Sequence, residues 1–520
     1  MKPTARFSDK VILNTFFNTV GRGWQVILAL LLTPYIVSSL GVEQYGIWAL
    51  FGVLIGYVGL LDMGISGSFV RYIADAVAQK DDDKFSSIVN TGLFFSVVFS
   101  LAGVAVVSVF SGPILGFLGV SPGNFNSAQR ALAVAMAGWA VSNSLCVFSS
   151  VQGGLQRMDL QNALGIVQSL LFAVLAVLAL KLHKGLVGLV WASAIPMMII
   201  SAVNIFIAAR LWPALRFGAR FVRRKMLITL FRFGYQMKIA VFADLISFQT
   251  DKILLGHFVG MASVTDYQLG ANLASMIRSY PGLVVSAAIP AATELHVRGE
   301  KSAVLEMYQR SYKYVAMAAF PVAALLIVGG HDLMRAWMNK GFPNAVLALR
   351  ILAVGYLANV MGAAAASIGV AIERPDIQKR AAVLMAAMNL VLSVVLVIKF
   401  GFIGVLFGTG ASLIAAHVYH LTMLNACIGA SVTDLWKKSL SVPFFAGVSG
   451  GIAAYAAGQA LLLAVLPDSR MTAFAFFAVK GLCLGGVYTA GIFAGTYLDK
   501  ADLDLLGRVP VLGGVLRLRL

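Results

Sequence analysis

Charged residues are scarce in this 520-residue sequence. Asp, Glu, Lys and Arg together make up 12% of it, whereas soluble domains average about 25%. Hydrophobic residues make up 59%, and the mean hydropathy is +0.86. A soluble fold cannot bury so much apolar surface in its core. The composition therefore excludes a soluble globular protein and predicts a chain embedded in a lipid bilayer.

Cysteine and the common catalytic motifs are also scarce. The three cysteines stand singly in apolar surroundings, which excludes a disulfide framework and a zinc ribbon. The chain has no phosphate-binding glycine loop of the P-loop type, so we expect no nucleotide hydrolysis. His417 and His420 lack an evident third ligand, and we interpret them as a satisfied interface pair rather than a metal site. The sequence therefore predicts no catalytic residue, no cofactor and no metal.

Long apolar runs fill most of the chain. Because a spanning helix needs about 20 mainly apolar residues, we predict an all-α polytopic membrane protein with about fourteen transmembrane helices. The connections between them are too short for an extramembrane catalytic domain. The predicted spans are residues 11–38, 45–68, 86–110, 128–151, 160–180, 186–209, 233–256, 262–290, 313–334, 345–371, 381–400, 402–426, 441–466 and 472–496.

The formal net charge of +18 comes from 40 Lys and Arg against 22 Asp and Glu. With the N-terminus placed in the cytoplasm, most of the basic residues fall in cytoplasmic segments, as the positive-inside rule requires. Both termini are then cytoplasmic. The densest run, from Arg210 to Arg232, is interpreted as a topological anchor that contacts anionic lipid. No aromatic platform accompanies this run, so we expect no nucleic-acid partner.

An internal repeat divides the chain. Arg157-x-Asp159 recurs 217 residues later as Arg374-x-Asp376, and Gly138-Trp139 recurs at the same offset as Gly355-Tyr356. An offset that covers six spans makes the two copies parallel, with a site expected at their interface. We predict two pseudo-symmetric six-helix lobes, residues 1–215 and 216–430, followed by two additional transmembrane helices and a cytoplasmic tail in residues 431–520.

Three stretches carry a family resemblance: LGVEQYGIWAL (40–50), LLDMGISGSFVRYIA (60–74) and QTDKILLGHFVG (249–260). Together with the two Arg-x-Asp turns, they resemble the Wzx-like polysaccharide flippases of the multidrug/oligosaccharidyl-lipid/polysaccharide exporter superfamily. The resemblance implies a V-shaped pair of six-helix lobes in the bacterial inner membrane. It also implies movement of undecaprenyl-diphosphate-linked oligosaccharide from the cytoplasmic to the periplasmic leaflet by alternating access, in O-antigen or exopolysaccharide biosynthesis. The implied partners are this substrate, membrane lipids and possible polysaccharide assembly proteins.

Two arginines lie deep in predicted spans, where a charge costs at least about 2.5–3.5 kcal/mol and usually faces a cavity or a partner. Arg22 shares one helical face with Asn18 and Gln25 in the first span, and Arg278 lies in the eighth span near Asn272. Guanidinium groups bind phosphate oxygens bidentately and keep their charge when desolvated. We therefore predict that Arg22 and Arg278 bind the diphosphate, and the alternative is that each pairs within the protein for packing.

The seventh predicted span carries Lys238, Asp244, Asp251 and Lys252. The two lysines are further substrate-binding candidates, although Lys238 and the Asp251–Lys252 pair lie near the span ends and can also reach the interface. Asp244 is deeper and is either an ion-coupling site or a counter-charge. Asp62, at the inner end of the second span, is also a candidate ion-coupling site or counter-charge. The alternative is that it caps a helix or pairs with another residue at the inner gate.

Three other functions remain open at this point. A cation-coupled multidrug exporter of the same superfamily would concentrate carboxylates in its lobes, whereas the deepest charges here are arginines. A lipid II flippase also needs buried basic residues. A membrane-embedded polysaccharide polymerase or glycosyltransferase would need a large external loop or an acidic catalytic motif, and the external loops are short.

Overall fold

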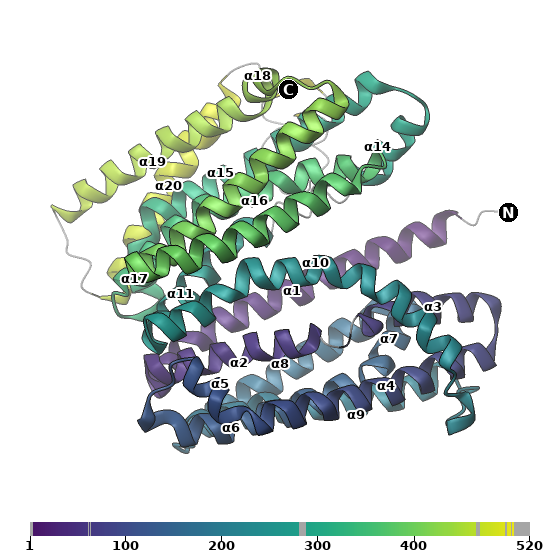
Figure 1. Cartoon of the computed structure of the whole chain (residues 1–520). Coiled ribbons are helices and arrows are strands. Elements are labelled where there is room, and N and C mark those ends of the chain that lie inside the picture. Colours follow the sequence, from purple (N-terminus) through teal and green to yellow (C-terminus); the bar gives the residue numbers. More distant parts are fainter. Residues whose placement is uncertain are drawn as a thin grey trace. The chain divides into compact units, whose positions relative to one another are not determined.

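The computed structural model of the chain describes residues 4–60, 62, 64–279, 288–463, 469–494, 497–500 and 502–503. Side chains are described in the same ranges, apart from those of residues 4–20, 22, 236–240, 279 and 288. Every regular element in these ranges is helical (Figure 1). This confirms the predicted all-α class.

The chain packs as two compact units, Met1–Thr265 and Asp266–Leu520. The first unit contains α1 (Thr4–Leu40), α2 (Val42–Leu60), α3 (Ile65–Gln79), α4 (Asp82–Val109), α5 (Ser111–Phe117), α6 (Pro122–Ser144), α7 (Cys146–Gly154), α8 (Met158–Lys181), α9 (Gly185–Leu211), the short 3-10 helix η1 (Ala219–Phe221) and α10 (Arg224–Phe258). The unit boundary falls within α11 (Met261–Ala274). The predicted division at residue 215 refers to the sequence repeat and stays a prediction.

The second unit continues with α12 (Met276–Ser279), α14 (Ala288–Val297), α15 (Lys301–Met338), α16 (Pro343–Ala371), α17 (Pro375–Ile428), α18 (Val432–Leu435), the π-helix η2 (Trp436–Leu440), α19 (Ser441–Leu462) and α20 (Arg470–Phe493). Among the described residues, ten helices are long and apolar enough to span a membrane, or eleven if the bent pair α6–α7 is one span. The predicted boundary between spans 381–400 and 402–426 is confirmed, because Gly401 within α17 has a non-helical φ of 56° and ψ of −130°. The count of fourteen spans is compatible with this arrangement and stays a prediction.

The internal repeat recurs as local structure. Arg157 donates two hydrogen bonds to Asp159 through Nε and one through Nη2, and Arg374 binds Asp376 through Nε and Nη2. In both copies the residue before the arginine, Gln156 or Glu373, has a positive φ near 60°. The turn that ends one helix and starts the next is therefore built twice in the same way.

The second predicted span, residues 45–68, is interrupted in the structure, although its hydropathy stays high throughout. α2 ends at Leu60, and α3 begins at Ile65 behind a turn that Asp62 stabilises. The Asp62 carboxylate accepts hydrogen bonds from the backbone N–H of Gly64 at 2.8 Å and from the hydroxyl of Ser66 at 2.6 Å. The two contacts hold the turn before α3 and give the backbone N–H of its N-cap residue, Gly64, a hydrogen-bond partner.

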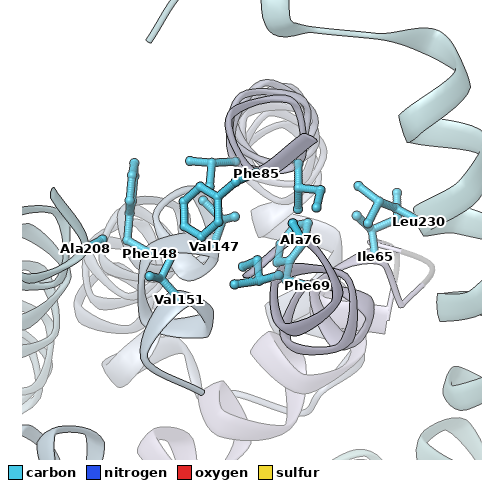
Figure 2. Packing of buried hydrophobic residues seen from close by; sticks show 12 residues of the cluster. Ile65, Phe69, Ala76, Phe85, Val147, Phe148, Val151, Ala208 and Leu230 are labelled. Carbon is cyan, nitrogen blue, oxygen red and sulfur yellow. The ribbon is translucent and has the colours of Figure 1, made fainter. Parts of the chain in front are cut away.

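A buried apolar cluster packs α3, α4 and α7 together in the first unit (Figure 2). Phe69, Phe85 and Phe148 have at most 2% of their surface exposed. The close approach of α3 to α4 depends on Gly92, because a Cβ at this position would lie 2.6 Å from the Phe69 ring. The ring of Phe85 stacks on that of Trp212 at 4.8 Å, which ties the end of α9 to the same cluster.

The basic segment after α9 is folded against α4 rather than extended. Asn90 donates a hydrogen bond to the carbonyl of Arg216 and accepts one from the N–H of Gly218. The hydroxyl of Thr91 accepts from the N–H of Arg223, and Phe221 is buried. The backbone of the segment is held by α4, while arginines such as Arg216, with 61% of its side chain exposed, face outward.

The last two spanning helices, α19 and α20, lie beside α15 within the second unit (Figure 1). A buried cluster of Ala454, Leu484 and Tyr488 packs against Phe320 and Leu325 of α15. Gly450 lies against the backbone of α20, since a Cβ there would approach the Leu484 carbonyl oxygen to 3.0 Å. The two helices outside the repeat are thus integral to the packing of the second unit.

Candidate functional site

In the first unit, polar side chains run along the contact between α1 and α8. The indole Nε1 of Trp24 donates to the hydroxyl of Ser169 at 3.0 Å. Gly21 faces the amide of Asn162, and the predicted site residue Gln25 is exposed and lies close to Gly165 of α8. Arg22 and Asn18 lie on α1, but their side chains fall outside the described residues. Their predicted contact with a diphosphate stays a prediction.

A second polar group of the first unit joins α2 to α10. The hydroxyls of Tyr57 and Thr250 share a hydrogen bond of 2.5 Å. The next two residues, Asp251 and Lys252, have 0% and 7% of their surface exposed, and Lys252 donates to the side chain of Gln249 at 2.7 Å. A cation and a carboxylate are therefore buried side by side in α10, in surroundings that also hold two hydroxyls.

The other charged candidates of α10 and α2 have different surroundings. Asp244 is exposed, and its role as an ion-coupling site or counter-charge stays a prediction. Lys238 lies on the same helix, but its side chain is outside the described part. Asp62 is 5% exposed and is engaged at the start of α3. Its position fits the capping alternative, and its role as a counter-charge stays a prediction.

In the second unit, Arg278 lies at the end of the short helix α12. Its guanidinium carbon is 5.4 Å from the centre of the Tyr356 ring on α16, within the distance of a cation–π contact. Tyr356 itself is buried, with 4% of its surface exposed. A ring at this distance attracts the cation through its π-system and brings no opposite charge to it.

The neighbouring turns of α11 carry further polar groups. The predicted site residue Asn272 accepts a hydrogen bond from the side-chain amide of Gln268 at 2.6 Å, and its backbone carbonyl accepts one from Ser275. Two residues before Gln268, Asp266 accepts from Asn344 of α16 at 3.2 Å. Gln268, Asn272 and Ser275 therefore form a hydrogen-bonded row on α11 and the turn after it, and Arg278 follows three residues after Ser275.

Some features of the sites were missed by sequence reasoning. The Tyr57–Thr250 bond joins residues 193 positions apart, and no sequence pattern indicates it. Tyr356 was noted only as a repeat position, because its contact with Arg278 depends on tertiary packing. The predicted satisfied state of the histidine pair was wrong: Nδ1 of His417 and Nε2 of His420 are buried without a hydrogen-bond partner.

Two ionic clusters in the second unit were also unexpected. Lys480 of α20 pairs with Asp332 of α15 at 2.5 Å. Asp502, which has no exposed surface, is bound by Lys313, Tyr314 and Arg310 of α15. Burial alone would raise the pKa of the Asp502 carboxyl, but the hydrogen bonds from Lys313 and Tyr314 hold this pKa below its usual value. In the described part of the chain, no three His, Cys, Asp or Glu side chains come together as a metal site.

These features define a class: a multi-pass, all-helical membrane protein with a repeated architecture and polar side chains in its spans. The fold is similar to that of the lipid II flippase MurJ in an inward closed conformation, with a TM-score of 0.70 at 15% identity. The match covers 93% of this chain and 99% of that one, and it shows the fold alone.

The chain belongs to the polysaccharide biosynthesis protein family, whose model matches residues 11–296. A putative O-antigen transporter of Shigella flexneri is 20% identical over 68% of this chain and 82% of its own length. A probable low-salt glycan biosynthesis flippase of Haloferax volcanii is 22% identical over 82% of this chain and 84% of its own length. The predicted resemblance to polysaccharide flippases is confirmed by this family membership.

Proposed function

We propose that this protein is a flippase that moves a lipid-linked oligosaccharide across the membrane during polysaccharide biosynthesis. The observation that carries the proposal is the family match over residues 11–296, together with relatives named as an O-antigen transporter and a glycan flippase. The all-helical fold, shared with a lipid II flippase, suits an amphiphilic cargo.

The finer proposal concerns the cargo and its direction. The substrate is an oligosaccharide on undecaprenyl diphosphate, moved from the cytoplasmic to the periplasmic leaflet of the inner membrane, with both termini of the protein cytoplasmic. The excess of basic residues in the predicted cytoplasmic segments supports this orientation. Alternating access would present the sugar-diphosphate head first to one side and then to the other.

The diphosphate is assigned to Arg22 and Arg278, with Asn18, Gln25 and Asn272 beside the two arginines. Support for Arg278 comes from its place on Tyr356 and at the end of the Gln268–Asn272 row. A guanidinium beside a ring still offers several N–H donors, and a diphosphate requires such donors. Polysaccharide assembly proteins remain possible partners of the same pathway.

The lysines and carboxylates of α10 and α2 are assigned secondary roles. Lys252 and Lys238 would add positive charge for the substrate, while Asp244, Asp251 and Asp62 would serve as coupling sites or counter-charges. The exposure of Asp244 supports an exchangeable proton or ion at this position. The burial of Asp251 beside Lys252 supports a counter-charge there.

The test is a deletion strain that lacks any redundant flippase. We expect surface polysaccharide to disappear and the lipid-linked sugar to accumulate in the cytoplasmic leaflet. Arg278→Ala should abolish complementation at wild-type protein levels, whereas Arg278→Lys should restore part of it. Lys340→Gln, which removes one exposed positive charge in the same unit, is the matched control. Normal glycan with an unchanged leaflet distribution in the deletion strain would overturn the proposal.

A further inference from the structure

An apolar groove runs along the second unit between α15, α16 and α19. It has a volume of about 480 Å³, within the range of about 300–1,000 Å³ that is usual for small-ligand pockets. Its lining is almost wholly aliphatic and aromatic and includes Phe320, Val328, Val354, Leu357, Phe444 and Ile452. A cavity with this lining on a membrane helix suits a hydrocarbon chain.

A second cavity, of about 400 Å³, continues this groove. The two share Ile327, Val328 and Tyr455 in their linings, so the apolar space and the polar one meet. The second cavity is lined by four charged or titratable side chains from three helices: His331, Asp332, Arg350 and Lys480. One continuous hollow therefore has an apolar part and a charged end.

Counted without His331, the charged end has one net positive charge, because Arg350 and Lys480 stand against Asp332 alone. His331 contacts the same carboxylate, with Nδ1 3.7 Å from Oδ1 of Asp332. Asp332 and Lys480 are paired at 2.5 Å and largely buried. Arg350 is exposed, and its Nε donates to the carbonyl of Ile327 at 2.9 Å. Arg350 thus supplies the surplus positive charge at the mouth of the cavity.

Arg350 lies near the N-terminal end of a spanning helix. It is seven residues beyond the start of α16 at Pro343, which corresponds to about 10 Å along the helix. An arginine near a helix end can extend to the membrane interface, where its guanidinium can bind phosphate oxygens. In a membrane, phosphate-headed lipids are the anions at hand.

We propose that this groove binds an anionic phospholipid, with one acyl chain in the apolar part and the headgroup phosphate at Arg350 and Lys480. A phosphodiester carries a single negative charge, which balances the single surplus positive charge of the site. A diphosphate carrier would bring more negative charge than these residues offset. The site lies within the second unit, partly on a helix outside the repeat, and is separate from the Arg278 row.

Native mass spectrometry of the full-length protein, released from bilayers that contain phosphatidylglycerol or phosphatidylcholine, tests the site. We expect a retained phosphatidylglycerol molecule on the wild-type protein and at least a fivefold lower bound fraction for Arg350→Gln. Arg350→Lys, which preserves the charge, should retain most of the binding. Lys399→Gln removes an exposed positive charge elsewhere in the unit and should leave binding unchanged.

A second variant tests the apolar part without touching any charge. A Cβ at Gly451 would meet Val328 at an ordinary 3.6 Å, so Gly451→Leu should fold, fill the groove and reduce lipid retention to the level of Arg350→Gln. Equal retention of both lipids, or wild-type retention by Arg350→Gln, would overturn the proposal. So would displacement of phosphatidylglycerol by polyprenyl phosphate, which would assign the groove to the carrier. Glycan export is not needed for any of these readouts, so they are independent of the flippase assay.

Discussion

The ion pair between Lys480 and Asp332 joins α20 to α15, and its removal is the sharpest test of how the second unit is held together. The Nζ–Oδ2 distance is 2.5 Å, and the side chains are 12% and 6% exposed. Removing one partner of a buried pair leaves the other charge uncompensated and costs about 3–5 kcal/mol. We expect Lys480→Met and Asp332→Asn each to lower the free energy of unfolding by this amount.

A double-mutant cycle separates the pair from its surroundings. Because Lys480→Met with Asp332→Asn leaves no buried charge, the double variant should be more stable than the sum of the single losses by about 2–3 kcal/mol. The measurement is reversible unfolding in mixed micelles, followed by tryptophan fluorescence. Additive losses, with no coupling between the two positions, would refute the reasoning.

Gly458 of α19 provides an independent check on the same geometry. The Lys480 side chain crosses this glycine, since a Cβ there would lie 2.3 Å from Lys480 Cε. Gly458→Ala should therefore push the lysine away from Asp332 and destabilise the protein, whereas the same change in a Lys480→Ala background should cost little. Equal costs in both backgrounds would show that Gly458 acts through helix packing alone.

Three further predictions concern other contacts. Tyr356→Leu removes the ring beside Arg278 and should weaken glycan export, measured by complementation, more than it lowers protein abundance, measured by immunoblot. Equal losses of export and abundance would indicate a packing role only. Because the pKa of Asp502 is depressed in the folded state, its contact with Lys313 stabilises the protein fully above the ordinary carboxyl pKa of about 4. This stability is lost as the pH falls through the lower folded-state pKa. Asp502→Asn should therefore lower the free energy of unfolding at pH 7 by about 3 kcal/mol and flatten the acid side of a plot of melting temperature against pH; an unchanged acid side would contradict the assignment. Asn90→Ala frees the basic segment after α9 at a cost of about 1–3 kcal/mol and should speed tryptic cleavage there; unaltered cleavage would show that Asn90 does not hold this segment.

Local features were the most predictable. The arginine and the aspartate of each Arg-x-Asp turn lie only two residues apart in sequence. The same pattern in both copies of the repeat therefore indicated the same local structure. The breaks were harder to predict. Hydropathy does not register the turn at Asp62 that follows the end of α2. It did place a break at Gly401, where the backbone of α17 leaves the helical region.

Long-range pairs were beyond sequence reasoning. Lys480 and Asp332 are 148 positions apart, and no sequence pattern indicates that a lysine in the middle of α20 pairs with an aspartate of α15. For the same reason, sequence identified Arg278 by its depth but not the ring on which it lies. The buried neighbours of a charge come from other helices, and one sequence does not indicate which helix faces which.

The sequence by itself determined that the chain is an all-helical membrane protein, that it contains a repeat, and which family it resembles. The spans follow from the summed transfer energies of neighbouring residues. The repeat and the resemblance follow from residue identities that can be compared along the sequence. Tertiary structure alone decided which buried charges are paired and where an arginine is left exposed beside a groove. The energy of a buried charge depends on its distance from a partner, and that distance exists only after the helices have packed.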